Sequence, residues 1–241
     1  IVQEKKHPEW FARISELREE ENRRTSSAIA NKYSKNCENC TNSCDKSGIS
    51  ADDRMNPFEI IDIVSSHAGD AVVVTDVGQH QMWAAQRYPL KAPRPFLTSG
   101  GLGTMGFGMG AAIGAAAASG KRSLLFTGDG SFGMNLNELA TAVSQNLPLV
   151  IVLMNNGVLG NVRQWQTMFY GERYSQTTLG RKTDFMKLAD AFGATGFRAD
   201  DKKSLAEALD KAFALKSPCL VECIIDLSLI HISEPTRPRL I

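Results

Sequence analysis

Residues 123–156 read SLLFTGDGSFGMNLNELATAVSQNLPLVIVLMNN, and this stretch decides the fold that we expect. The apolar runs at 123–127 and 149–154 predict two buried strands. Between them, residues 131–146 carry apolar side chains at helical spacing, and Ser131 is a suitable N-cap for that helix. A strand, a crossover helix and a second strand form the unit from which parallel sheets are built. The stretch therefore predicts an α/β fold.

Polar residues follow both predicted strands at their carboxyl ends. Asp129 stands between two glycines after the first strand, and Asn156 comes 27 residues later, after the second. Open parallel sheets bind ligands at this edge, and a helix N-terminus beside Asp129 would attract phosphate. Carboxylate and amide oxygens next to phosphate are common surroundings for Mg²⁺. The pair predicts a magnesium and phosphate site, whereas Gly-Asp-Gly alone would indicate only a turn.

Length and composition exclude several other classes. The 241 residues are enough for one full α/β domain with additional segments. With 27 basic and 26 acidic residues the net charge is +1, so we expect no nucleic-acid partner. No apolar run approaches the ~18 residues that span a bilayer, so we expect no membrane partner. The chain begins with Ile1 rather than methionine, and we therefore expect a native N-terminus further upstream.

The five cysteines form two groups. Cys37, Cys40 and Cys44 have CxxC and CxxxC spacing in a polar stretch. A metal or cluster site there would need a fourth ligand, and a redox pair or an incidental polar loop are the alternatives. Cys219 and Cys223 lie in a strand pattern with their side chains on one face. The odd total favours a reducing compartment.

The rest of the chain continues the α/β pattern. Apolar strands that alternate with helices predict a doubly wound parallel sheet with helices on both faces. A further strand, 71–75, precedes His80, which is either a structural residue or a functional one at a strand end. We expect helices over 7–33 in part, 57–66, 111–118, the residues after Asn156, 184–192 and 202–216, and strands over 194–198 and 219–225.

A glycine-rich segment, residues 96–119, contains Gly101-x-Gly103-x-x-Gly106, which matches the dinucleotide fingerprint. That site needs a ribose-binding acid at the end of the next strand, and Asp129 is instead placed in a glycine turn. A dinucleotide would also leave the two asparagines unexplained. We therefore interpret the segment as a turn that exposes its backbone to a cofactor ring, with Met105 either as a core residue or as a polarisable contact with that ring.

Five segments together resemble the large catalytic subunit of acetolactate synthase, a thiamine-diphosphate enzyme, and GDG…NN is the signature of such enzymes. The segments are TDVGQHQMWAAQ (75–86), FLTSGGLGTMGFG (96–108), GDGSFGMNLNELATAV (128–143), MNNGVLG (154–160) and RQWQTMFY (163–170).

The resemblance divides the chain into three parts. It implies a thiamine-diphosphate-binding fold over 56–226, the C-terminal domain of a much longer protein. Residues 1–55 would be a linker helix and a cysteine-containing excursion that follow an absent central domain. Residues 227–241 read like translated sequencing adapter, so we expect a non-native tail where the family has its C-terminal lid. Gly110 also departs from the family, which usually has proline at this position.

The resemblance also implies a role for each site residue. Trp165, which could equally be a core residue, would shape the site for the second substrate. Mg²⁺ would be held by Asp129, Asn156 and the backbone carbonyl of Val158. The cofactor would contact Gln79, His80, Gly130 and Ser131 at its phosphates, Leu159 and Gly160 behind them, and Gly103 and Met105 at its aminopyrimidine.

The implied activity is the condensation of pyruvate with pyruvate or 2-oxobutyrate, with loss of CO₂, in branched-chain amino-acid biosynthesis. It requires thiamine diphosphate and Mg²⁺, with FAD in the full-length protein. The glutamate that protonates the pyrimidine ring belongs to an absent domain, so we expect no catalytic residue in this chain and little activity from it alone.

The expected assembly is a homodimer or a dimer of dimers with a regulatory small subunit. We expect it in the cytoplasm, or in a plastid or mitochondrion of a eukaryote. The alternatives are a pyruvate oxidase, a 2-oxo acid decarboxylase, and a non-catalytic remnant that only binds its cofactor or a partner subunit.

Overall fold

The computed structural model describes residues 55–90, 96–180 and 182–225, together with single residues between 9 and 23. The chain forms two compact units, one of Ile1–Gly48 with Ile232–Ile241 and one of Ile49–His231. In the first unit the described residues are helical, as expected for this stretch. The predictions for Cys37, Cys40, Cys44 and the tail lie outside the described residues. The account below concerns the second unit.

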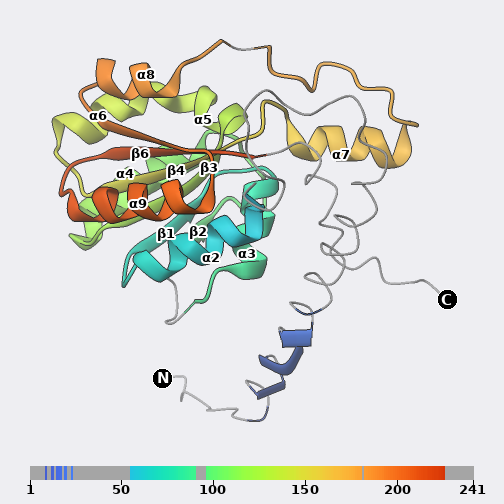
Figure 1. Ribbon diagram of the computed structural model, residues 1–241, viewed down its shortest axis with the longest axis horizontal. Helices are drawn as coiled ribbons and strands as arrows, with labels where there is room; N and C mark the ends of the chain where they lie inside the picture. Colours follow the sequence, from blue (N-terminus) through green and yellow to red (C-terminus); the bar gives the residue numbers. More distant parts are fainter. Residues whose placement is uncertain are drawn as a thin grey trace. The chain divides into compact units, whose positions relative to one another are not determined.

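The second unit contains a six-stranded parallel sheet in the order β2-β1-β3-β4-β6-β5 (Figure 1). This confirms the α/β parallel fold that the sequence predicts. In chain order the elements are α2 (Pro57–His67), β1 (Val72–Thr75), α3 (Gln79–Arg87), β2 (Phe96–Thr98), α4 (Phe107–Ser119), β3 (Ser123–Gly128), α5 (Asp129–Asn135), the 3₁₀ turn η1 (Leu136–Glu138), α6 (Leu139–Ser144), β4 (Leu149–Asn155), α7 (Gly160–Phe169), α8 (Phe185–Ala191), β5 (Thr195–Ala199), α9 (Lys202–Ala214) and β6 (Cys219–Ile224).

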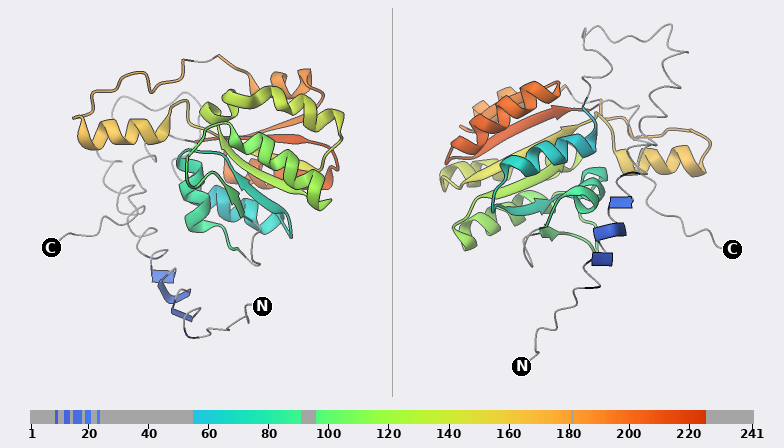
Figure 2. Two further views of the ribbon diagram at one scale, coloured as in Figure 1. Left: turned by 180° about the vertical axis from the view of Figure 1, so that it is seen from behind. Right: turned by 60° about the horizontal axis from the view of Figure 1, so that its bottom comes forward.

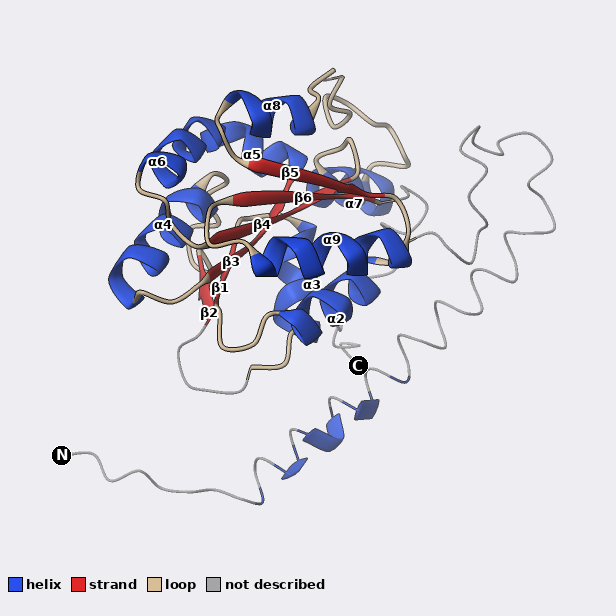
Figure 3. Ribbon diagram, turned by 60° about the vertical axis from the view of Figure 1, so that its left-hand side comes forward, coloured by secondary structure: helices blue, strands red, loops and turns tan. Residues whose placement is uncertain are grey.

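Helices cover both faces of the sheet, and each face has its own hydrophobic cluster. The face beneath α2, α3 and α9 contains Trp83, Phe126 and Leu209. The face beneath α4, α5, α6 and α8 contains Leu125 and Phe132. Neighbouring residues of β3 thus alternate between the two clusters, as the period of a strand requires. Figure 3 shows the two groups of helices on opposite sides of the strands.

The strand order reverses between β1 and β3. From β1 the chain passes to β2 on one side, and it then returns to form β3 on the other side of β1. In the register of the sheet, Val74 pairs with both Leu97 and Leu125. A reversal of this kind opens a crevice at the carboxyl ends of the strands, where open α/β sheets bind ligands. Helix α7 lies beyond the same edge, apart from both helical layers (Figures 1 and 2).

Several local expectations need correction. The helix that was expected to begin at the N-cap Ser131 begins at Asp129 instead, because Gly128 is the N-cap. That helix is also divided into α5, η1 and α6. Helix α3 and strand β2 were not anticipated, since β2 has only three residues and the first turn of α3 is polar. The other predicted elements are present, with ends that differ by a few residues.

Helix α4 begins earlier than its small-residue run indicates, because a distant side chain caps it. The Asp76 carboxylate accepts hydrogen bonds from the backbone N–H groups of Gly106, at 2.8 Å, and Gly108, at 3.3 Å. Both groups belong to the first turn of α4, where helical backbone donors lack partners. Helix α4 therefore already includes Gly110, which precedes the small-residue run.

Two glycines of α4 offer a matched test of this packing. A Cβ at Gly108 would lie 2.8 Å from Leu125 Cδ1 and 2.9 Å from Asp76 Cβ, whereas a Cβ at Gly114 would meet nothing within 4 Å. We expect Gly108→Ala to lower the free energy of unfolding by about 1–3 kcal/mol. Gly114→Ala should raise it by about 0.5–1 kcal/mol, because alanine favours a helix interior. Urea unfolding measures both, and equal shifts of the same sign would contradict this packing.

Candidate functional site

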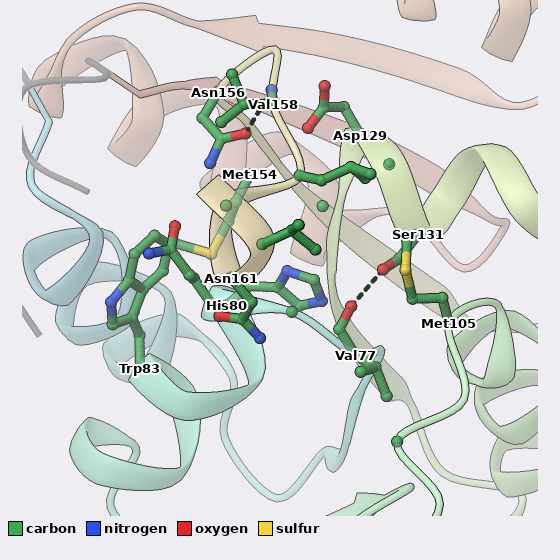
Figure 4. A pocket seen from close by; sticks show the side chains of 18 residues that line it. Val77, His80, Trp83, Met105, Asp129, Ser131, Met154, Asn156, Val158 and Asn161 are labelled. Carbon is green, nitrogen blue, oxygen red and sulfur yellow. Dashed lines mark hydrogen bonds between the residues drawn. The ribbon is translucent and has the colours of Figure 1, made fainter. Parts of the chain in front are cut away.

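The carboxyl ends of β1, β3 and β4 meet around one pocket (Figure 4). The pocket brings together residues from four separate segments of the sequence, at the strand reversal described above. Trp165 is not among the residues that line it. All eleven residues expected to contact the cofactor or the metal do line it: Gln79, His80, Gly103, Met105, Asp129, Gly130, Ser131, Asn156, Val158, Leu159 and Gly160.

Asp129 is the first residue of α5, and its carboxylate faces the side of the pocket where Asn156 lies (Figure 4). The residue is 5% exposed. Two residues further on, the Ser131 hydroxyl donates a hydrogen bond to the backbone carbonyl of Val77, which ties α5 to the segment after β1. Carboxylate oxygens are among the ligands that hard cations prefer. Asp129 is therefore a suitable ligand for a cation that enters the pocket.

Residues 155–158 form a tight loop after β4, which we call the metal loop. Its conformation comes from two amide side chains that bond to the backbone two residues ahead. Asn155 Oδ1 accepts from Gly157 N at 3.2 Å, and Asn156 Oδ1 accepts from Val158 N at 3.1 Å. Gly157 has a φ of +68°, which glycine adopts without strain. Because an amide oxygen has two lone pairs, Asn156 Oδ1 can hold this turn and also bind a metal ion.

His80 is buried, and its ring lies against two glycines. A Cβ at Gly78 would be 2.6 Å from His80 Cε1, and a Cβ at Gly128 would be 2.9 Å from His80 Nδ1. Burial lowers the pKa of His80 from 6.5 to about 3, although a hydrogen bond with the backbone of Asp76 opposes this shift. Its Nε2 atom has no hydrogen-bond partner among the described residues. The ring is therefore neutral at pH 7, with a nitrogen available to a ligand in the pocket.

Gln79 lines the pocket, where a phosphate contact was expected, and its amide also links two helices. Its amide nitrogen donates to Gln164 Oε1 at 3.0 Å, which links α3 to α7. Gly160 permits this link, because any side chain there would collide with the Gln79 amide. Gly130 has a similar effect: a Cβ there would be 2.8 Å from Leu159 Cδ2 and 3.6 Å from Met105 Cε.

Asp76 is the functional residue that the sequence interpretation missed. The residue is fully buried and follows β1 directly. Its carboxylate accepts from Val77 N at 2.8 Å as well as from Gly106 and Gly108. Burial raises the pKa of Asp76, and these backbone donors oppose the shift. Asp76 thereby fixes the turn that carries Gly103 and Met105. The sequence signal that could have identified Asp76 is its position directly after a buried strand.

Trp165 is not a core residue. It is 64% exposed on α7, and its ring makes an edge contact with Phe169 at a centroid distance of 5.7 Å. Val162 lines the pocket three residues before it. Residues three apart share a face of a helix, so Trp165 lies on the same face of α7 as Val162. Other lining residues that the sequence did not suggest are Val77, Gly78, Trp83, Gly128, Met154 and Asn161.

Cys219 and Cys223 are buried in β6 on one face with Val221, as expected. Burial raises the pKa of Cys219 to about 12, and it also raises that of Cys223. Within the described ranges, no three His, Cys, Asp or Glu side chains are grouped so that they could hold a metal ion. A cation at the pocket would therefore need amide, backbone or phosphate oxygens in addition to Asp129. None of the described helices is long and apolar enough to cross a membrane.

Comparison with known proteins places the pocket within a family match. Residues 76–223 match the family model described as thiamine pyrophosphate enzyme, C-terminal TPP binding domain. The acetolactate synthase large subunit of Lactococcus lactis is 46% identical over 176 residues, which cover 72% of this chain and 30% of that protein. The isozyme 2 large subunit of Escherichia coli is 51% identical over 158 residues, 65% of this chain and 29% of that protein.

A third relative comes from another organism. The probable acetolactate synthase large subunit of Methanocaldococcus jannaschii is 43% identical over 170 residues, 70% of this chain and 29% of that protein. The chain therefore spans about 30% of the length of the curated relatives that it matches. The family match extends from the end of β1 to β6 and contains every residue of the pocket.

Proposed function

Because the chain belongs to the thiamine pyrophosphate enzymes through their C-terminal cofactor-binding domain, we propose that its pocket binds the diphosphate of that cofactor through Mg²⁺. The Mg²⁺ ligands in this proposal are Asp129, the Asn156 amide oxygen and the backbone carbonyl of Val158. A hard cation accepts such oxygens together with phosphate oxygens and water.

The described residues fit a diphosphate in three respects. The Nε2 atom of His80 has no partner in the described structure, and it can donate to a phosphate oxygen when it carries a proton. Gly130 and Ser131 line the pocket in the first turn of α5, where backbone N–H groups lack helical partners. Asp129 and Asn156 place two oxygen ligands at the same pocket. In this proposal Gln79, His80, Gly130 and Ser131 contact the phosphates, and Gln79 also links α3 to α7.

The other end of the cofactor would lie against the turn that Asp76 holds. Gly103 has a φ of +63° and lines the pocket together with Met105. In the proposal the Gly103 carbonyl and the Met105 N–H orient the aminopyrimidine, the Met105 side chain supports the bend of the cofactor, and Leu159 and Gly160 close the pocket behind it. When bound, thiamine diphosphate supplies the carbon centre that adds to a 2-oxo acid and accepts the electrons released with CO₂. The chain's own residues hold and orient it and exclude water from its diphosphate.

The activity proposed for the whole enzyme is the condensation of pyruvate with pyruvate or 2-oxobutyrate to acetolactate or acetohydroxybutyrate. The observation that carries it is the 43–51% identity to acetolactate synthase large subunits across the pocket. The name large subunit also supports a small partner subunit. FAD, a homodimer or dimer of dimers, branched-chain biosynthesis and a cytoplasmic or organellar location belong to the same proposal.

A graft tests this activity in a complete enzyme. Residues 56–225 would replace the matching segment of one of these relatives, and acetolactate formation from pyruvate would be measured with and without thiamine diphosphate and Mg²⁺. We expect acetolactate only when both are present, and none from the same graft with Asp129→Ala. An assembled graft that binds the cofactor but releases acetaldehyde or acetate would favour a decarboxylase or an oxidase instead.

Trp165 provides a narrower test in the same graft. Trp165→Leu should leave thiamine-diphosphate binding and the urea midpoint unchanged, because the side chain is largely exposed. It should shift the product ratio toward acetolactate, since 2-oxobutyrate has one more methylene, worth ~1–3 kcal/mol in an apolar pocket. Tyr170→Leu, at an exposed site further along the chain, is the control. An unchanged product ratio for Trp165→Leu would remove Trp165 from the substrate site.

A further inference from the structure

Glu222 is a buried carboxylate in the middle of β6, and the residue is 2% exposed. One oxygen, Oε2, accepts from Arg198 Nε at 2.9 Å, and the other, Oε1, accepts from Asn155 Nδ2 at 2.8 Å. Arg198 lies on the neighbouring strand β5 and is also 3.6 Å from an oxygen of Asp184. The pairing with Glu222 raises the pKa of Arg198. The ion pair compensates the buried charge and leaves Oε1 for Asn155.

The contact with Glu222 determines the orientation of the Asn155 amide. A carboxylate can only accept hydrogen bonds, so the NH₂ group of Asn155 must face it. The amide oxygen of Asn155 then faces the other way, where it accepts from Gly157 N. Ile225 N donates to the Asn155 carbonyl at 2.9 Å and fixes the backbone at the same point. The shape of the metal loop thus depends on Glu222, which lies on β6 between Arg198 on β5 and Asn155 on β4.

We propose that Glu222 is a positioning residue for the metal loop, which sets the geometry of Asn156 and Val158 and thereby the affinity for Mg²⁺ with the diphosphate. This inference rests on the proposed function. Mg²⁺ demands near-ideal octahedral geometry, so small displacements of its ligands weaken its binding. Residues that orient metal ligands typically change metal affinity by about 10–100-fold when they are mutated.

Stability alone does not account for Glu222. Apolar residues surround it along β6 and β4, and an apolar residue would satisfy a buried strand position equally well. Replacing a buried ion pair by apolar side chains is often neutral or stabilising. A buried carboxylate directed at a loop asparagine therefore indicates that Glu222 serves the conformation of the loop rather than the stability of the sheet.

The test exchanges donor and acceptor across the Glu222–Asn155 contact. In E222Q, the amide oxygen of the glutamine can accept the hydrogen bond from Arg198. Its NH₂ group then faces the NH₂ group of Asn155, and two donors cannot bond to each other. One of the two contacts is lost in either orientation. In the double variant N155D/E222Q, the glutamine oxygen accepts from Arg198 and its NH₂ donates to the new carboxylate, which still accepts from Gly157. The charge of the pair is unchanged in this exchange.

The readout is the Kd of Mg²⁺ for the 241-residue chain at saturating thiamine diphosphate, measured by calorimetry, together with the urea midpoint without either ligand. We expect E222Q to weaken Mg²⁺ by about ten-fold. N155D/E222Q should return the Kd to near the wild-type value. The control D184N removes the other acid beside Arg198, retains a side chain able to cap α8, and should leave the Kd unchanged.

The outcomes separate this inference from the proposed function. If the wild-type chain binds thiamine diphosphate with Mg²⁺ but E222Q binds Mg²⁺ equally well, the positioning role is wrong. It is also wrong if N155D/E222Q is folded, by its urea midpoint, and binds Mg²⁺ no better than E222Q. If E222Q fails to fold, the positioning role is tested by comparing the Kd of Mg²⁺ for N155D/E222Q with that for the wild-type chain. If the wild-type chain binds no Mg²⁺ with thiamine diphosphate, the proposed function itself is overturned.

Discussion

Asp129→Ala should abolish Mg²⁺-dependent binding of thiamine diphosphate to this chain. The variant removes the carboxylate proposed to bind the cation, at a residue that is 5% exposed. Without this ligand the pocket would hold Mg²⁺ weakly, and the diphosphate would then lack the cation that neutralises it in a largely buried pocket. Removing one partner of a buried charge pair costs ~3–5 kcal/mol, so the Kd should rise by at least about 100-fold. Calorimetric titration with thiamine diphosphate in the presence of Mg²⁺ measures this change.

Two further variants control that experiment. Asp129→Asn keeps the shape and one oxygen but loses the charge, so its Kd should lie between those of wild type and Asp129→Ala. Asp190→Ala removes an exposed carboxylate on α8 and should bind as the wild type does. Wild-type affinity in Asp129→Ala would rule out the metal assignment.

The second large effect is a loss of stability in acid caused by His80. Its pKa is about 3 in the folded chain and 6.5 ordinarily. Between these values the unfolded chain binds a proton that the folded chain does not, so stability is complete above pH 6.5 and falls as the pH falls toward 3. The expected loss is ~1.4 kcal/mol per pH unit, or about 2 kcal/mol from pH 7 to pH 5.

Urea unfolding at about pH 7, where this contribution is complete, and at about pH 6 and pH 5, where it declines, gives the measurement. In His80→Gln, the free energy of unfolding should fall much less as the pH is lowered, because glutamine does not titrate. His67→Gln, on α2, should retain it. Asp76 acts in the opposite sense, because its raised pKa favours the folded chain as it takes up a proton, so the difference between wild type and His80→Gln isolates the contribution of His80. An equal decline in His80→Gln and wild type would show that His80 is not the source.

Much of the site could be predicted from the sequence because its residues stand at strand ends. The segments after β1, β3 and β4 carry His80, Asp129 and Asn156, and parallel strands bring their carboxyl ends to one edge. Apolar runs identify such strands, and the direction of the chain then determines which polar residues meet. The eleven expected residues gather at one pocket for that reason.

The residues that were missed or reassigned act across long distances in the sequence. Asp76 caps α4 from 30 residues away at Gly106, and Glu222 contacts Asn155 across 67 residues. Local spacing contains no signal for either bond. Serine is a residue type that favours the N-cap position, yet the Ser131 hydroxyl bonds to the Val77 carbonyl because α5 starts earlier. Gln79 was assigned to phosphate by resemblance, and only the packing of α7 shows its bond to Gln164.

The most direct test of the central claim is a titration of the wild-type chain with thiamine diphosphate, with Mg²⁺ and with a chelator. The proposed site predicts a single site that requires Mg²⁺, with affinity at least about 100-fold weaker when the cation is removed. Thiamine without its diphosphate should show little binding, because the Mg²⁺ ligands would have no phosphate to bridge. Binding of thiamine and thiamine diphosphate with equal affinity, or the same affinity in the presence of the chelator, would contradict the account.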